Sequence, residues 1–216
     1  GGAAPAVGSR FRFPTLARTL LAIAKGGSKA FYEGEIAAEM AATVRAAGGL
    51  LDEADLAGVA ADWVTPVPAP YAGHDVLEIP PSGQGITALI LMRLLEKAGA
   101  AGLAPDSAER YHLEIEAGRL AYAVRDHLVA DPASMTCSPQ DLLSDRFIDA
   151  LAAQLFPDRR NPSIAVPDVP RSDTVYLTVV DRDRRAVSFI NSVYSSFGAK
   201  LATPESGIVL QNRGGC

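Results

Sequence analysis

Cysteine, histidine and tryptophan are scarce in this chain, and the first two shortages exclude whole classes of site. Among 216 residues there are 2 cysteines, 3 histidines and 1 tryptophan. Cys137 and the terminal Cys216 cannot build a disulfide framework or a cysteine-based metal site. The histidines stand alone at His74, His112 and His127, without the spacing that one metal ion needs. We therefore expect neither a metal nor any other cofactor.

Long apolar runs and basic clusters are missing too. No apolar run reaches the roughly 18 residues that a bilayer-spanning helix needs. The net charge is −5 and lysine and arginine do not cluster, which argues against a nucleic-acid partner. Apolar residues make up 48% and charged residues 21%, as in an ordinary globular protein with a sizeable core. Because the chain begins at Gly1 and ends just after a strand-like stretch, we expect it to be a fragment of a longer protein.

Apolar periodicity predicts helices over most of the first 156 residues. One helix begins near Pro14, with Leu16, Leu20, Leu21 and Ile23 expected on one face. Further helices are expected over about 34–47, after Asp52, after the glycines of "SGQG", over 107–130 and, as two short ones, within "DLLSDRFIDALAAQLF". Asp52 and Asp55 have the spacing of a capping box. The helix over 107–130 has the clearest apolar stripe, formed by Leu113, Ala117, Leu120, Ala121, Val124 and Leu128.

Strands are expected mainly near the end of the chain. Residues 62–72 alternate with prolines and predict an irregular edge strand, followed by a short strand in "HDVLEIPP". The stretch 171–192 alternates like a buried hairpin around a charged turn at 181–185, and a third strand is expected over Ile208–Gln211. Helices followed by strands indicate an α+β fold.

Charged side chains on the 107–130 helix leave two interpretations open. Glu114 and Glu116 could do acid–base work as paired carboxylates. With Arg119, Arg125 and Asp126 at helical spacing, they more often form a solvated face with ion pairs, and we favour that interpretation.

The glycine-rich "PPSGQG" at 80–85 also has two interpretations. It precedes a helix and could hold an anion on backbone N–H groups. The lysine of a phosphate-binding loop is missing, so a tight turn and helix cap is favoured.

Thr174 opens the hairpin directly behind a proline-rich loop at 157–172. Most threonines in strands are only sheet residues. A chain break before Thr174 would give it a free α-amino group, which can act as general base for its own hydroxyl. One residue would then supply both halves of an acyl-transfer centre.

Five blocks in unbroken order resemble the γ-glutamyltranspeptidase family of N-terminal-nucleophile hydrolases. They are "FRFPTLARTLLAIAKGGSKAFYEGEIAAEM" (11–40), "GGLLDEADLAG" with the following strand to Gly73, "IPPSGQGITALILMRLLE" (79–96), "EAGRLAYAVRDHLVADP" (116–132) and "DTVYLTVVDRDRRAVSFINS" onward (173–215). The resemblance implies a four-layer αββα sandwich, of which this chain would hold a part.

The resemblance also implies self-cleavage of the bond between Asp173 and Thr174. Residues 1–173 would be the C-terminal part of a large subunit ending in a flexible loop, and 174–216 the start of a small subunit. Both would belong to one domain and form a heterodimer after cleavage. Thr174 would be the nucleophile that takes the acyl group of a γ-glutamyl or related amide, such as glutathione, before water or an amine accepts it. Ser192 matches a family threonine whose hydroxyl contacts the nucleophile.

Three positions depart from the glutamyl-specific pattern. Tyr194 replaces an asparagine, Arg213 after Asn212 replaces a glutamine, and Cys216 stands where an aspartate pairs with the substrate's ammonium. We expect Tyr194, Asn212 and Arg213 to contact substrate. Because a guanidinium binds a carboxylate with two hydrogen bonds, we expect an acylase-like or hydrolytic member with an altered acyl preference.

An alternative remains open, namely a non-catalytic relative that keeps the fold as a scaffold or binding protein. Thr174 and Ser192 favour the enzyme. The resemblance implies that the substrate-carboxylate arginine and the oxyanion hole of the family lie outside this chain, so we expect the chain alone to be inactive.

Overall fold

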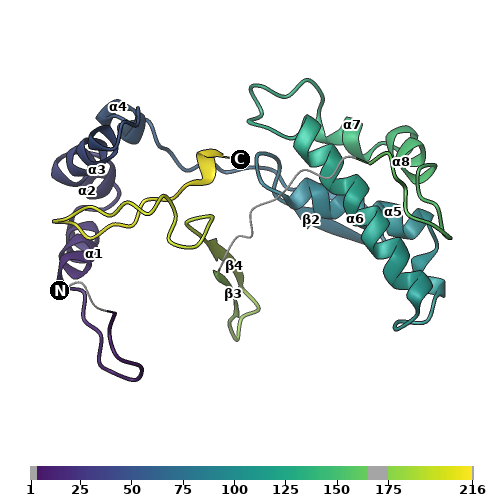
Figure 1. The fold of residues 1–216 in the computed structure, drawn as a ribbon, viewed down its shortest axis with the longest axis horizontal. Helices are drawn as coiled ribbons and strands as arrows, with labels where there is room; N and C mark the ends of the chain where they lie inside the picture. Colours follow the sequence, from purple (N-terminus) through teal and green to yellow (C-terminus); the bar gives the residue numbers. More distant parts are fainter. Residues whose placement is uncertain (1–3, 165–174, 216) are drawn as a thin grey trace. The chain divides into compact units, whose positions relative to one another are not determined.

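The computed structural model describes residues 4–164 and 175–215, and the chain divides into two compact units. The first comprises Gly1–Ala61 with Pro170–Cys216, and the second comprises Asp62–Val169. Each unit combines helices with a two-stranded antiparallel sheet, which confirms the α+β class (Figure 1).

Two helices form the centre of the second unit. The apolar stripe predicted on the long helix is buried against the neighbouring helix, with Ala117 and Ala121 at 0% exposure. Two short helices complete this core through Leu142 and Ile148. These helices are α5 (Gly85–Lys97), α6 (Ala108–Leu128), α7 (Pro139–Leu143) and α8 (Asp145–Ala152), with a 3₁₀ turn η1 (Ala100–Gly102) between α5 and α6.

The sheet of the second unit explains the alternating prolines. Strand β1 (Val67–Tyr71) pairs antiparallel with β2 (His74–Glu78). Val67 and Ala69 point inward and pack with Leu89 of α5, while Pro68 and Pro70 are exposed. The edge strand predicted over 62–72 is confirmed for Val67–Tyr71 only, where a two-stranded sheet leaves one side of β1 free of ladder hydrogen bonds.

The segment "PPSGQG" forms the tight turn that we favoured, between β2 and α5. A Cβ atom on Gly85 would lie 2.7 Å from the carboxylate of Glu78 and 3.0 Å from the backbone oxygen of Ile79. It would also lie 2.8 Å from the Cβ atom of Glu78, which cannot swing aside as a carboxylate can, so a larger residue would force the strand and the turn apart. The helix cap expected with this turn is wrong, because Gln84 precedes the helix and its side chain makes no cap hydrogen bond.

Four helices lie in the first unit: α1 (Pro14–Gly26), α2 (Lys29–Tyr32), α3 (Glu35–Ala46) and α4 (Glu53–Ala57). The four-residue α2 was not predicted. The capping box before α4 is confirmed, because Asp52 Oδ1 accepts from the backbone N–H of Ala54 and Asp55, and Asp55 Oδ2 accepts from Asp52 N–H.

The apolar face predicted on α1 is only partly buried. Leu20 and Leu21 are 58% and 60% exposed, whereas Thr19 is 4% exposed. Thr19 Oγ1 donates to the backbone oxygen of Ser206 at 2.8 Å. The inward face of the helix is thus fixed by a polar contact to a distant segment, which apolar periodicity alone does not reveal.

The hairpin near the end of the chain has the predicted two strands and charged turn. Strand β3 (Val175–Val180) pairs antiparallel with β4 (Ala186–Asn191), and Asp181 Oδ1 accepts from two backbone N–H groups of the charged turn. The expected burial is wrong, because apolar side chains on both faces are at least half exposed: Leu177, Val179, Val180, Val187, Phe189 and Ile190.

The third strand predicted over Ile208–Gln211 is also wrong within the described residues. It is reduced to an isolated bridge between Ala202 and Val209 in a narrow loop. Ile208 and Leu210 instead pack against the core of α3 around Ala37 and Met40. The segment 208–211 is therefore held by packing on α3 and not by pairing with a strand.

Candidate functional site

The predicted cleavage bond, Asp173–Thr174, lies outside the described residues, and so does Cys216. The next described residue is Val175, the first residue of β3. Val175 pairs with Asn191, the last residue of β4, and Ser192 follows directly. The structure therefore describes the site from the residue after the predicted nucleophile onward.

Beyond β4 the chain makes a turn that starts at Ser192. Ser192 Oγ accepts a hydrogen bond from the backbone N–H of Tyr194 at 2.9 Å. Tyr194 has a φ of 76°, in the left-handed region that residues other than glycine rarely adopt. Such backbone strain is concentrated at functional sites, where the surrounding structure maintains it.

The structure brings the other predicted residues to this turn. Asn212 Oδ1 accepts from Ser195 N–H at 3.0 Å, and Asn212 N–H donates to the backbone oxygen of Val193 at 3.2 Å. The guanidinium of Arg213 lies 5.2 Å from the ring centroid of Tyr194, close enough for a cation–π contact. Two segments that are about twenty residues apart along the sequence thus form one cluster.

A glycine allows these two segments to approach. A Cβ atom on Gly198 would lie 2.1 Å from the backbone oxygen of Leu210, and Gly198 has a φ of +55°. Next to it, Ala199 N–H donates to the same Leu210 oxygen at 2.8 Å. This close contact fixes the position of Leu210, and with it the backbone of Asn212 and Arg213, which follow shortly after in the sequence.

The cluster offers a hydroxyl, a phenol, an amide and a guanidinium. Residues 4–164 and 175–215 contain no group of three His, Cys, Asp or Glu side chains that could hold a metal ion. His112 and His127 both lie on α6. A ring nitrogen of His112 lies 2.7 Å from the backbone oxygen of Phe156, and a ring nitrogen of His127 lies 2.8 Å from that of Ala123. The four side chains of the cluster can form hydrogen bonds, and the guanidinium of Arg213 can bind an anion.

A buried ion pair on α6 corrects the prediction of a solvated face. Glu116 is 2% exposed, and Arg119 Nη1 donates to both of its carboxylate oxygens at 2.7 and 2.9 Å. Glu116 lies three residues after Leu113, so it falls on the buried stripe of the helix. Glu114, on the other side, pairs with Arg110 and is half-exposed, as predicted.

The same pair holds the beginning of the proline-rich loop. Glu116 Oε2 accepts from Asn161 N–H at 2.8 Å, and Arg119 donates to the backbone oxygens of Asn161 and Ile164 at 3.1 and 3.3 Å. Burial raises the pKa of Glu116, but the hydrogen bonds from Asn161 and Arg119 outweigh it and hold the pKa below the ordinary glutamate value. The carboxylate is therefore ionised at neutral pH.

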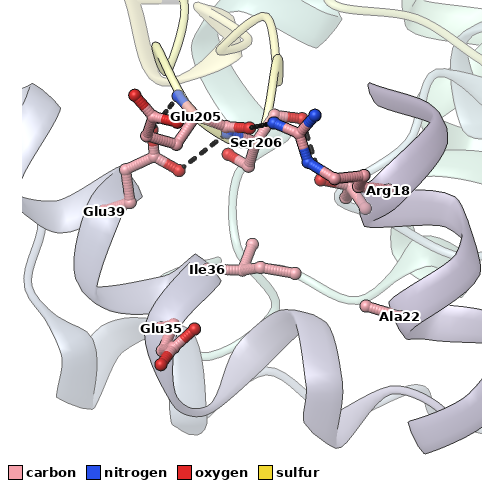
Figure 2. A pocket seen from close by; sticks show the side chains of 8 residues that line it. Arg18, Ala22, Glu35, Ile36, Glu39, Glu205 and Ser206 are labelled. Carbon is pink, nitrogen blue, oxygen red and sulfur yellow. Dashed lines mark hydrogen bonds between the residues drawn. The ribbon is translucent and has the colours of Figure 1, made fainter. Parts of the chain in front are cut away.

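A pocket of about 390 Å³ lies in the first unit, and its lining does not include Ser192, Tyr194, Asn212 or Arg213 (Figure 2). It is lined by Arg18, Thr19, Ala22, Glu35, Ile36, Glu39, Glu205 and Ser206. Figure 2 shows Glu39 of α3 extending to the loop that carries Glu205 and Ser206.

Glu39 accepts two backbone hydrogen bonds from that loop. The N–H of Glu205 lies 2.6 Å from Glu39 Oε1, and the N–H of Ser206 lies 3.0 Å from Oε2. Partial burial raises the pKa of Glu39, but hydrogen bonds from Ser206 and Glu205 outweigh it and lower the pKa overall. Each carboxylate oxygen thus has its own backbone partner.

The sequence analysis missed Thr19 and Glu39 and assigned Glu116 to the wrong environment. All three are polar residues within the inward stripe of an amphipathic helix, beside apolar neighbours such as Ile36 and Met40. A polar residue on such a stripe needs a buried partner, and that is the signal that could have identified them.

Comparisons with known proteins agree over nearly the whole chain. A sequence model described as gamma-glutamyltranspeptidase matches residues 1–215. The glutathione hydrolase-like YwrD proenzyme of Bacillus subtilis is 35% identical over 216 residues, which is 99% of this chain and 40% of that protein. The oxamate amidohydrolase proenzyme of Klebsiella pneumoniae is 34% identical over 213 residues, again 99% of this chain and 40% of that protein.

A solved structure adds a likeness of fold. The cephalosporin acylase of Bacillus halodurans matches with a TM-score of 0.83 at 36% identity, over 99% of this chain and 38% of that one. The chain thus spans about 40% of the length of the relatives that it matches. In the described part of the chain, no helix is long and apolar enough to cross a membrane.

Proposed function

Because this chain belongs to the gamma-glutamyltranspeptidase family, we propose that it is part of an autoprocessing amide hydrolase or acyltransferase with Thr174 as nucleophile. The precursor cleaves itself between Asp173 and Thr174. Residues 1–173 then end the large subunit and 174–216 begin the small one, within a shared four-layer αββα sandwich. The two subunits remain together as a heterodimer.

The register of the β3–β4 hairpin carries this proposal. Val175 is bonded to Thr174, and its partner Asn191 is bonded to Ser192. Opposite residues of an antiparallel pair have Cβ atoms about 4.5–5.5 Å apart. The register therefore supports a contact between the hydroxyls of Thr174 and Ser192 when the ladder is extended by one pair.

The proposed reaction uses the hydroxyl of Thr174 and the α-amine that cleavage would free on the same residue. The free amine of Thr174 takes the proton from its own Oγ, which attacks the carbonyl carbon of the amide substrate. The carbon–nitrogen bond breaks, the leaving amine takes up that proton, and an ester joins the acyl group to Thr174. Water or a second amine then attacks the ester and restores the hydroxyl. Ser192 would orient the nucleophile through its hydroxyl.

Arg213 and Tyr194 support an acyl preference other than γ-glutamyl. The guanidinium of Arg213, placed over the ring of Tyr194, presents a positive charge suited to a carboxylate on the acyl group. Two similar proteins are named an oxamate amidohydrolase and a cephalosporin acylase, which agrees with amides other than γ-glutamyl ones. We propose an acyl donor with a terminal carboxylate and no adjacent ammonium, such as a glutaryl amide.

Mass spectrometry of the intact protein tests the processing step. The wild type should yield a chain whose first residue is Thr174, Thr174→Ser should still cleave, and Thr174→Ala should remain whole. A wild-type chain that stays uncut after long incubation would contradict the proposal and favour the scaffold alternative.

Kinetics on two matched substrates test the acyl preference. The processed protein should hydrolyse glutaryl p-nitroanilide with a higher kcat/KM than the γ-glutamyl compound. Arg213→Gln, which restores the glutamyl-type residue, should lower kcat/KM for the glutaryl compound roughly tenfold or more, since hydrogen bonds to charged groups are worth about 1.5–3 kcal/mol. A preference for the γ-glutamyl compound in the wild type would defeat this part of the proposal.

A further inference from the structure

We propose that Glu39 is a latch that keeps the C-terminal cleavage product attached to the helices of the first unit. The latch binds the loop at residues 203–207, called here the latch loop. This inference rests on the proposed cleavage before Thr174, because only cleavage makes the latch loop part of a separate chain.

Hydrogen bonds from two helices hold the latch loop. Glu39 of α3 accepts the N–H groups of Glu205 and Ser206 at 2.6 and 3.0 Å. From α1, Thr19 Oγ1 donates to the backbone oxygen of Ser206 at 2.8 Å, and Arg18 Nη2 donates to that of Glu205 at 3.2 Å. Two successive residues are therefore bound through both their N–H and their C=O groups, as Figure 2 shows for Glu39 and Arg18.

The latch loop is shaped for this contact. Thr203 and Ser206 share a buried hydroxyl pair at 2.6 Å, and Thr203 N–H donates to the backbone oxygen of Ile208 at 2.9 Å. Gly207, with a φ of +69°, lies so close to α1 that a Cβ atom would be 2.9 Å from Leu16 N. The loop thus presents its backbone to the helices without a side chain in between.

Apolar packing continues the contact on the C-terminal side of the latch loop. Ile208 and Leu210 pack against the cluster of Ala37, Met40 and Leu56 on α3 and α4. This packing holds the segment but is not directional, since apolar contacts do not fix register. The paired hydrogen bonds to Glu39 fix which residues of the segment face α3.

The proposed cleavage bond lies between the two sides of the latch in the sequence, which is why the latch can hold the two products together. All its helix-side residues precede the proposed cleavage bond, and the latch loop follows it. Both sides belong to the same compact unit. Cutting the backbone before Thr174 therefore leaves every one of these contacts in place. Glu39 also holds the loop six residues before Asn212, so it positions the segment that carries Asn212 and Arg213.

Hydrogen exchange and subunit release in the intact protein test the latch. Four forms are compared: wild type, Glu39→Ala, Glu39→Gln and, as a control, Glu35→Ala. Glu35 lines the same pocket, and among the described residues no hydrogen bond joins its side chain to another residue. Exchange is followed by mass spectrometry on peptides covering 201–208, and retention of the C-terminal product by native mass spectrometry in increasing urea.

Glu39→Ala should speed exchange at Glu205 and Ser206 about tenfold or more, because two hydrogen bonds to a charged acceptor are lost. Its cleavage product should also be released at lower urea than that of the wild type. Glu39→Gln keeps one acceptor oxygen and should fall between, and Glu35→Ala should match the wild type. If Glu39→Ala does not fold, the intermediate Glu39→Gln still gives the comparison.

Failure of the latch and failure of the proposed function give different results. Unchanged exchange in both Glu39 variants overturns the latch, even if cleavage is normal. Faster exchange in a chain that is never cleaved supports the contact but overturns both the cleavage and the role in retention. Faster exchange with cleavage, but with product release at the wild-type urea concentration, overturns the retention role alone.

Discussion

Glu39 and Glu116 perform the same task in the two units under different conditions. Glu116 accepts one backbone N–H group from a distant part of the chain and Glu39 accepts two, and hydrogen bonds lower the pKa of each carboxyl against the opposing effect of burial. Glu116 is 2% exposed and paired with Arg119, whereas Glu39 is half-buried at the edge of an open pocket.

The two carboxylates differ in how much stability their removal should cost. Removing Glu116 would leave the guanidinium of Arg119 buried without its partner, a large penalty. Removing Glu39 would leave two N–H groups that water from the pocket can reach. A carboxylate with a buried cation is therefore a permanent part of the core, whereas one facing solvent can release its loop at modest cost.

The largest effect is expected for Glu116→Ala. Removing one member of a buried ion pair costs about 3–5 kcal/mol of unfolding free energy. Urea unfolding of the intact protein measures it, with Glu114→Ala as the control on the solvent side of the same helix. Equal losses in the two variants would show that the Glu116–Arg119 pair is not the anchor of the loop at 161–164.

Gly207→Ala should have the next largest effect, because it strains the latch loop and forces it away from α1. The left-handed φ costs about 1–2 kcal/mol and overpacking a further 1–3. Gly73 has a φ of +79° but no atom within 4 Å of an added Cβ, so Gly73→Ala isolates the backbone cost. Thermal unfolding in which both variants lose the same stability would contradict a tight contact at Gly207.

The smallest effect is the pH dependence of the Glu39 latch. Its pKa is lower in the folded protein, so its contribution is complete above the ordinary glutamate pKa of about 4.3 and is lost as pH falls through the lowered value. Arg18 of α1, Glu35 of α3 and Glu205 of the loop are the charged groups that surround it.

Glu39→Gln should therefore be less stable than the wild type by about 1 kcal/mol at pH 7, the net value of an ordinary hydrogen bond. The difference should shrink as the pH falls below about 4. Urea unfolding of both proteins across this range measures the gap, with Glu35→Gln as the reference. A gap that is constant with pH would show that ionisation of Glu39 does not matter.

Local pattern was enough to predict most of the secondary structure. The stripe of α6, the capping box at Asp52 and the strands and turn of the β3–β4 hairpin all depend on residues close in sequence. The third strand was wrong, and Leu20 and Leu21 on the apolar face of α1 are exposed, because distant contacts decide both features. Thr19 turns inward to reach Ser206, and Ile208 packs on α3 instead of pairing.

The candidate site shows the same division. Family resemblance selected Ser192, Tyr194, Asn212 and Arg213, and the structure places them around one turn. Spacing could not reveal Glu39, because its partners lie 166 and 167 residues away. The left-handed backbone of Tyr194 was equally hidden, since aromatic residues rarely adopt it.

The exposed hairpin has a practical consequence for handling this chain. In the described residues, β3 and β4 form a sheet of their own, so each strand has an unpaired edge, and apolar residues such as Val180 and Phe189 face solvent. Uncovered edges with apolar flanks template strand addition between molecules. Preparations of the chain in isolation are therefore expected to aggregate with increasing concentration through these two strands.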